Sequence, residues 1–144
     1  MAFTRGADGT RIHYDVWGQR QGEWLLLIQG LGADIRGWIA QRHALGARYR
    51  CIALDNRGVG RSDRPDGPYD LEVMAADAVA VLDAAGIASA HVMGASMGGI
   101  LAQILAVGHP GGCGRSCSPA RRAVTCPGGW SCSRVGPIRL ATPG

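Results

Sequence analysis

Apolar and polar residues alternate near the start of the chain in two short segments, residues 3–5 and 11–17. A two-residue period is typical of a β-strand with one buried face. Residues 7–9, Ala-Asp-Gly, lie between the segments and contain the Asp-Gly pair favoured in tight hairpin turns. This pattern predicts an antiparallel hairpin, with His13 as a solvated strand residue.

Further along, a continuous apolar run at residues 24–28 replaces the alternation, and residues 50–54 and 90–93 are predicted as two further strands. Runs of this length indicate strands that are buried on both faces of a parallel sheet. Helices are predicted over residues 35–45, 71–85 and 97–107. Strands that alternate with helices predict an α/β fold with a mostly parallel, doubly wound sheet of about five strands.

Three further expectations concern these helices. Trp38, Ile39 and Leu45 are predicted as the apolar anchors of the first helix. Asp70 is positioned to cap the second helix, and Gly86 to end it. The third helix is apolar on all sides, so we expect it to be buried.

A candidate catalytic motif joins the last predicted strand to the last helix. Gly94-Ala95-Ser96-Met97-Gly98 fits the G-x-S-x-G pattern of a nucleophile elbow. A serine at the tip of such a turn adopts a strained backbone that leaves its hydroxyl accessible. Gly94 and Gly98 suit this geometry because larger side chains would collide across the turn. The N–H group of Met97, at the start of the helix, could then face an oxyanion.

The charge distribution and the hydrophobic pattern limit the kinds of partner that we expect. Residues 1–109 carry ten arginines and eleven acidic residues, whereas residues 110–144 carry five arginines and no acidic residue. This distribution gives no basic stripe on a folded face, so no nucleic-acid partner is expected. No apolar run is long enough to span a membrane and no signal peptide is evident, so a cytoplasmic protein without a membrane partner is expected.

Five cysteines are present, and four of them lie between residues 113 and 132. Their spacings match no common zinc pattern, and Cys51 lies in a predicted buried strand. The sequence therefore predicts no metal site, and it contains no motif that calls for a cofactor.

Three glycine-rich motifs, in this order, make residues 3–110 resemble the N-terminal half of an α/β-hydrolase. They are Leu27–Gly32, which is similar to the loop after the family's third strand, Asp55–Asp63, which resembles its D-x-R-G-x-G-x-S segment, and the elbow itself. The resemblance implies that Ser96 is the nucleophile and that the N–H groups of Leu31 and Met97 form an oxyanion hole. It also implies a small-molecule ester, lactone or similar acyl substrate. Gln29 departs from the histidine that is usual in the first motif, a position that shapes the loop.

The groups that would activate Ser96 are not found in this sequence. The family places its catalytic acid and histidine after the elbow, but no acidic residue follows Asp83 and only His109 follows Ser96. His109 lies at the far end of the predicted helix, about 19 Å from the serine at about 1.5 Å per residue. His43 and His91 are predicted on a helix surface and in a strand, respectively.

Residues 111–144 do not continue the pattern. Residues 110–144 contain five of the seven prolines and show little hydrophobic periodicity. We interpret residues 1–110 as the N-terminal part of a hydrolase domain and residues 111–144 as an irregular or disordered tail, translated out of frame. Read two bases along, that region can encode an apolar segment of the kind expected at the next strand.

Two functional interpretations stay open. The first is a serine-dependent hydrolase by ancestry, inactive as this truncated 144-residue chain. The second is a non-catalytic remnant, or one half of a split protein. In both, the last predicted strand would be left as an exposed sheet edge through which the chain could self-associate.

Overall fold

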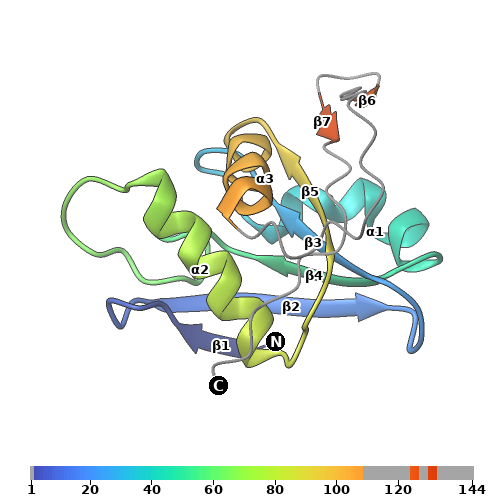
Figure 1. The fold of residues 1–144 in the computed structure, drawn as a ribbon, viewed down its shortest axis with the longest axis horizontal. Coiled ribbons are helices and arrows are strands. Elements are labelled where there is room, and N and C mark those ends of the chain that lie inside the picture. Colours follow the sequence, from blue (N-terminus) through green and yellow to red (C-terminus); the bar gives the residue numbers. More distant parts are fainter. Residues whose placement is uncertain (1, 109–123, 127–129, 133–144) are drawn as a thin grey trace.

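The computed structural model describes residues 2–108, 124–126 and 130–132. In this part of the chain, seven strands form one sheet in the order β1-β2-β4-β3-β5-β7-β6. The strands are β1 (Ala2–Arg5), β2 (Arg11–Gly18), β3 (Trp24–Ile28), β4 (Arg50–Leu54), β5 (His91–Ala95), β6 (Val124–Cys126) and β7 (Trp130–Cys132). The helices are the 3₁₀ helix η1 (Ile35–Trp38) and the α-helices α1 (Ile39–Gly46), α2 (Leu71–Ala84) and α3 (Met97–Gly108). Figure 1 shows these elements in space.

The predicted α/β class is confirmed, but the sheet is parallel only at its centre. β3 pairs with β4 and with β5 in parallel, whereas the other described pairs are antiparallel. β1 and β2 form the predicted hairpin, with Gly9 in the left-handed region at φ 84°. Because β3, β4 and β5 run in the same direction, the loops that follow them lie at one edge of the sheet.

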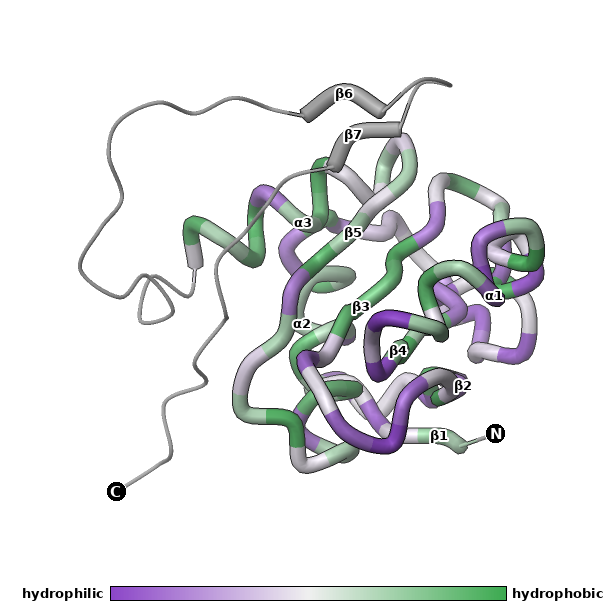
Figure 2. Tube along the Cα trace, turned by 90° about the vertical axis from the view of Figure 1, so that its right-hand side faces the viewer, coloured by the Kyte–Doolittle hydropathy of each residue, from purple (hydrophilic) through white to green (hydrophobic). Residues whose placement is uncertain are grey.

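Helices cover both faces of the central strands, which explains the uninterrupted apolar sequence of β3. Leu26 and Ile28 join a core with α2 and α3, while Leu25 and Leu27 join a second core with Trp38 of η1. Successive strand residues point to opposite faces, so neighbouring leucines enter different cores. Figure 2 shows β3 as a hydrophobic strand within the sheet.

The first predicted helix is split into η1 and α1. Trp38 is buried as expected, but Ile39 is 77% exposed, so its predicted role as an anchor is wrong. A 3₁₀ helix has about three residues per turn and an α-helix about 3.6. The change of helix type at this point therefore shifts which side chains face the core.

The two later helices match their predicted positions, with two differences. Gly86 ends α2 at φ 66°, but the side chain of Asp70 makes no capping hydrogen bond. In α3, Leu101 and Leu105 are buried, whereas Ile100 is 49% and Val107 is 76% exposed. The expectation that α3 is buried on all sides is wrong, because no described element covers this side of it.

The region predicted to be an irregular tail lies mostly outside the described residues, but β6 and β7 belong to it. β7 pairs with β5 in antiparallel fashion, through Gly94↔Ser131 and Ala95↔Trp130. The prediction of a bare edge on β5 is therefore wrong at its C-terminal end. An exposed strand edge is a template for any extended segment, which accounts for such pairing.

Candidate active site

Ser96 occupies a sharp turn between β5 and α3. β5 ends at Ala95 and α3 begins at Met97, so a single residue joins strand to helix. Ser96 has φ 50° and is the only non-glycine residue with positive φ in the described part of the chain. The turn is held by a hydrogen bond from the Gly99 N–H to the Ser96 carbonyl, 2.8 Å long. An exposed serine in this strained conformation matches the backbone expected of a nucleophile elbow.

The glycines on either side of Ser96 lie where the backbone leaves no space for a side chain. A Cβ atom on Gly94 would overlap the carbonyl group of Gly98. A Cβ atom on Gly98 would overlap the carbonyl oxygen of Ile28, the last residue of β3. Both glycines are therefore required by close approach of the backbone, which is the physical reason behind the G-x-S-x-G spacing.

The loop after β3 lies beside Ser96. A Cβ atom on Gly30 would be 3.2 Å from the Cβ atom of Ser96 and 3.7 Å from its hydroxyl oxygen. Leu31, the next residue, is 83% exposed to solvent. Met97 follows Ser96 at the start of α3, where helix N–H groups have no acceptor within the helix. Gly30 of the loop and Met97 of the helix therefore lie next to the serine on two different elements.

Gln29 shapes this loop from within. Its side chain is buried at 5% exposure and packs on Gly37 of η1, where a Cβ atom would overlap the Gln29 amide. Its backbone carbonyl accepts a hydrogen bond from the Asn56 side chain, 3.0 Å away. Both contacts join the loop to neighbouring segments, so Gln29 has a structural place in the loop.

The segment after β4 is a buried polar network. The Arg57 guanidinium donates to both carboxylate oxygens of Asp77 on α2, at 2.7 and 2.8 Å, and to Asp8 in the β1–β2 turn, at 2.7 Å. Opposite charge and hydrogen bonding by Asp77 raise the pKa of Arg57 above its already high value. The network joins three segments and does not involve Ser96.

Within residues 2–108, no histidine is placed beside Ser96. His91 begins β5 and its Nε2 lies 3.1 Å from the Glu23 carboxylate. It lies five positions before the serine along an extended strand, about 16 Å away at about 3.3 Å per residue. His43 is exposed on α1. His109 lies outside the described residues.

His13 differs from its predicted solvated state. It is 5% exposed, and its Nδ1 lies 2.8 Å from a carboxylate oxygen of Asp55. Its Nε2 is buried and has no hydrogen-bond partner among the described residues. The alternating pattern could not reveal this, because the second face of β2 is covered by η1 and α1, which are distant in sequence.

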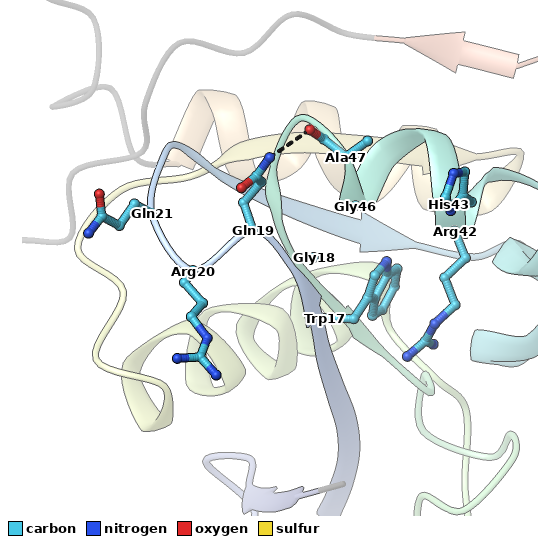
Figure 3. Close-up of a pocket in the computed structure, with 9 residues that line it drawn as sticks. All are labelled: Trp17, Gly18, Gln19, Arg20, Gln21, Arg42, His43, Gly46 and Ala47. Carbon is cyan, nitrogen blue, oxygen red and sulfur yellow. Dashed lines mark hydrogen bonds between the residues drawn. The ribbon is translucent and has the colours of Figure 1, made fainter.

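A large cavity in the described part of the chain is on the other side of the molecule from Ser96. Its volume is 720 Å³, and it is lined by residues of β2, the β2–β3 loop and α1, including Trp17 and Arg42. Figure 3 shows Arg42 beside the Trp17 ring and the hydrogen bond from Gln19 to the Ala47 carbonyl. Gly18 pairs with the first residue of β4, so the cavity lies at the sheet edge opposite to Ser96. The second cavity, of 540 Å³, is lined by His13, Asp55 and η1, and Ser96 does not line it.

Other classes of site are not found in the described part of the chain. No group of three or more histidine, cysteine or acidic residues there could hold a metal ion. None of its helices has the length and apolar character needed to cross a membrane. Burial raises the pKa of the Cys51 thiol to about 11, which leaves it protonated near neutral pH and a poor nucleophile.

A family model described as "alpha/beta hydrolase fold" matches residues 23–115. The chain is 40% identical over 110 residues to "Putative carbamate hydrolase RutD" of Azorhizobium caulinodans, a match that covers 76% of this chain and 40% of that protein. It is 34% identical over 107 residues to "3-oxoadipate enol-lactonase 2" of Acinetobacter baylyi, covering 74% of this chain and 40% of the relative.

A solved structure is similar in both sequence and shape. The enol-lactonase of Burkholderia xenovorans LB400 gives a TM-score of 0.72 at 35% identity, over 76% of this chain and 42% of that chain. The chain spans about 40% of the length of the two curated relatives named above.

Proposed function

This chain belongs to the alpha/beta hydrolase fold family, and from this premise we propose that Ser96 is the nucleophile of a serine-dependent acyl hydrolase. In the proposed reaction, the Ser96 hydroxyl loses its proton to a base as its oxygen bonds to the substrate's carbonyl carbon. The bond from that carbon to the leaving alcohol then breaks, and the alcohol takes up a proton. Attack by water on the acyl-enzyme releases the carboxylic acid and restores Ser96.

The observation that carries the proposal is the backbone of Ser96, at φ 50° between a strand and a helix. Such strain is maintained only where surrounding structure imposes it, and here Gly94 and Gly98 make the necessary close contacts. The turn leaves the hydroxyl exposed at the edge of the sheet where β3 ends and the loop after it begins. An exposed serine in an ordinary surface turn would need neither the strain nor the tight glycine contacts.

An oxyanion hole formed by the N–H groups of Leu31 and Met97 is part of the same proposal. These two donors would stabilise the negative charge that develops on the carbonyl oxygen. Gly30 supports the assignment, because a Cβ atom at this position would be 3.2 Å from the Cβ atom of Ser96, so the residue before Leu31 lies beside the serine. Two backbone donors on separate elements suit a tetrahedral intermediate formed at Ser96 Oγ.

We propose carboxylic esters and lactones as the substrate class, with carbamates as a further member. The names of the relatives, an enol-lactonase and a carbamate hydrolase, both describe the cleavage of an acyl group. One mechanism at an acyl carbon covers all three substrates. Ser96 lines neither of the two cavities described above, so the proposal does not extend to a particular alcohol or acid.

The base and its orienting acid would have to come from outside residues 2–108. A second candidate function is therefore one half of a split protein, completed by a separate polypeptide. The uncovered face of α3, with Ile100 and Val107 exposed, favours it. A non-catalytic remnant is the remaining alternative, and size-exclusion chromatography of the purified chain distinguishes a monomer from a self-associated assembly.

We also propose that residues 111–144 are encoded out of frame. The nucleotide sequence beyond codon 110 tests this directly. A long alternative frame that encodes a downstream aspartate and histidine would support the proposal. A stop codon soon after codon 110 in both alternative frames would rule it out.

The proposed function is tested by turnover of a short-chain p-nitrophenyl ester and of a simple lactone. Wild type, Ser96→Ala and Ser89→Ala are compared, because Ser89 is a partly exposed serine in the segment before β5. We expect slow hydrolysis that disappears in Ser96→Ala and persists in Ser89→Ala. Equal rates in all three proteins would refute the proposal.

A further inference from the structure

Two consecutive residues after β4 hold the two ends of the loop that lies beside Ser96. The Asn56 side-chain amide donates to the Gln29 carbonyl at 3.0 Å, at the start of the loop. The Asp55 carboxylate accepts from the Ile35 N–H at 2.8 Å, at its end. Both hydrogen bonds are buried. The segment between them contains Gly30 and Leu31.

The loop has little else to fix it. Its described internal hydrogen bonds near the serine are a 3.3 Å bond from the Ala33 N–H to the Gly30 carbonyl and a 3.4 Å contact between the Gly30 N–H and the Gln29 side chain. Gly30 and Gly32 add backbone freedom, and Gly32 has φ 72°. A segment of this kind depends on attachments at its ends to keep a single conformation.

The Asp55 side chain, which holds the end of the loop, is itself fixed in position. Its carboxylate also accepts from the Arg61 N–H, 3.0 Å away, and contacts His13 Nδ1 at 2.8 Å. Asp55 is 3% exposed, and a Cβ atom on Gly60 would overlap its carboxylate. Its position is therefore set by β2, by its own loop and by η1 together.

The Asn56 side chain, which holds the start of the loop, is buried and only partly hydrogen-bonded. Asn56 is 1% exposed, and its Oδ1 has no hydrogen-bond partner among the described residues. An unpartnered buried oxygen is destabilising, so an apolar residue would be a simpler choice if only packing mattered. The contact that accounts for an amide at this position is its donation to Gln29.

We propose that Asn56 and Asp55 are positioning residues that hold the backbone N–H of Leu31 in place for the oxyanion. This inference rests on the proposed function, because it assigns Leu31 its role in the same reaction. Donors act on a developing charge only within a narrow range of distance, about 2.7–3.1 Å. A loop that moves by about 1 Å would therefore slow acyl transfer while leaving ground-state binding nearly unchanged.

Amide hydrogen exchange and kinetics test the inference together. Asn56→Ala removes the donor, and Asn56→Asp keeps the shape but places an acceptor against the Gln29 carbonyl. Asp8→Asn is the control, since it removes one partner of Arg57, which follows Asn56, without contact to residues 29–35. The reporters are the amides of Ala33 and Ile35, which are hydrogen-bonded in the wild type.

We expect exchange at Ala33 and Ile35 to be about tenfold faster in both Asn56 variants and unchanged in Asp8→Asn. We also expect the kcat of Ser96-dependent ester hydrolysis to fall about 10- to 100-fold, with KM changed less than about threefold, as loss of an oxyanion donor implies. Unchanged exchange in the Asn56 variants would overturn the inference, as would faster exchange with unchanged kcat. Wild type without Ser96-dependent turnover would instead refute the proposed function, and exchange alone would then decide whether Asn56 holds the loop.

Discussion

Gly98 packs against the backbone carbonyl of Ile28, so closely that a Cβ atom would overlap the carbonyl oxygen. This contact joins the first turn of α3 to the last residue of β3. The start of α3 and the end of β3 are therefore in direct backbone contact.

Replacing Gly98 with alanine should destabilise the fold. The new methyl group must displace backbone, and overpacking of this kind costs about 1–3 kcal/mol. The matched control is Gly108→Ala at the end of the same helix, where no atom lies within 4 Å of the added Cβ. Urea unfolding should show a loss of about 2 kcal/mol for Gly98→Ala and almost none for Gly108→Ala. Equal effects would contradict the packing described.

The folded protein should be more stable with glycine at position 96 than with alanine. Both replacements remove the hydroxyl group, but only glycine adopts φ 50° without strain. Left-handed strain in a non-glycine residue costs about 1–3 kcal/mol, partly offset by glycine's greater freedom when unfolded. We expect Ser96→Gly to exceed Ser96→Ala by about 1 kcal/mol in the free energy of unfolding. The reverse order would show that the turn is not strained.

The buried pair of Arg57 and Asp77 gives a third prediction. Arg57→Met leaves the Asp77 carboxylate, 2% exposed, without its cation. An uncompensated buried charge of this kind costs about 3–5 kcal/mol. The double variant Arg57→Met/Asp77→Leu should recover much of that loss, since it buries no charge. If both variants unfold at the same urea concentration, the pair does not act as a unit.

Asp8 should make stability depend on pH. The hydrogen bond from Arg57 holds the pKa of its carboxyl well below the usual range, with help from the Thr10 N–H. A lowered pKa stabilises the fold above the unfolded value, about 3.9, and this contribution is lost as pH falls through the folded value. The free-energy difference between wild type and Asp8→Asn should therefore be positive at pH 7 and shrink below pH about 4.

The control for this effect is Asp66→Asn, a change at an exposed position in the loop between β4 and α2. Urea unfolding at pH 7 and at acid pH measures all three proteins. A difference between wild type and Asp8→Asn that stays constant with pH would show that the hydrogen bond with Arg57 does not lower the pKa of Asp8.

Local features of this chain could be predicted from its sequence, and the comparisons confirm the family expected from its three glycine-rich motifs. Gly94 is needed because of its contact with Gly98, which is close in sequence, so this part of the turn is visible as a motif. The contact of Gly98 with Ile28 is not visible in this way, because Ile28 belongs to a distant strand. The burial of His13 and the exposure of Ile39 could not be predicted. Each depends on how η1 and α1 pack across the sheet, and a period of two or 3.6 residues carries no information about a covering element.

The contacts of Asp55 and Asn56 with the loop after β3 were also beyond prediction. Asn56 lies 27 residues from Gln29, and Asp55 lies 20 residues from Ile35. Asp55 was recognisable only as a motif residue, and no pattern marked Asn56. Such pairs become neighbours because parallel β3 and β4 end at the same edge of the sheet.

The most direct test of the account is the site of covalent acylation. Purified chain is incubated with p-nitrophenyl acetate, quenched in acid, digested and analysed by mass spectrometry. We predict one acetyl group on Ser96 in wild type and in Ser89→Ala, and none on the corresponding peptide of Ser96→Ala. Acetylation spread over other residues, with Ser96 unmodified, would contradict the assignment of Ser96 as the nucleophile.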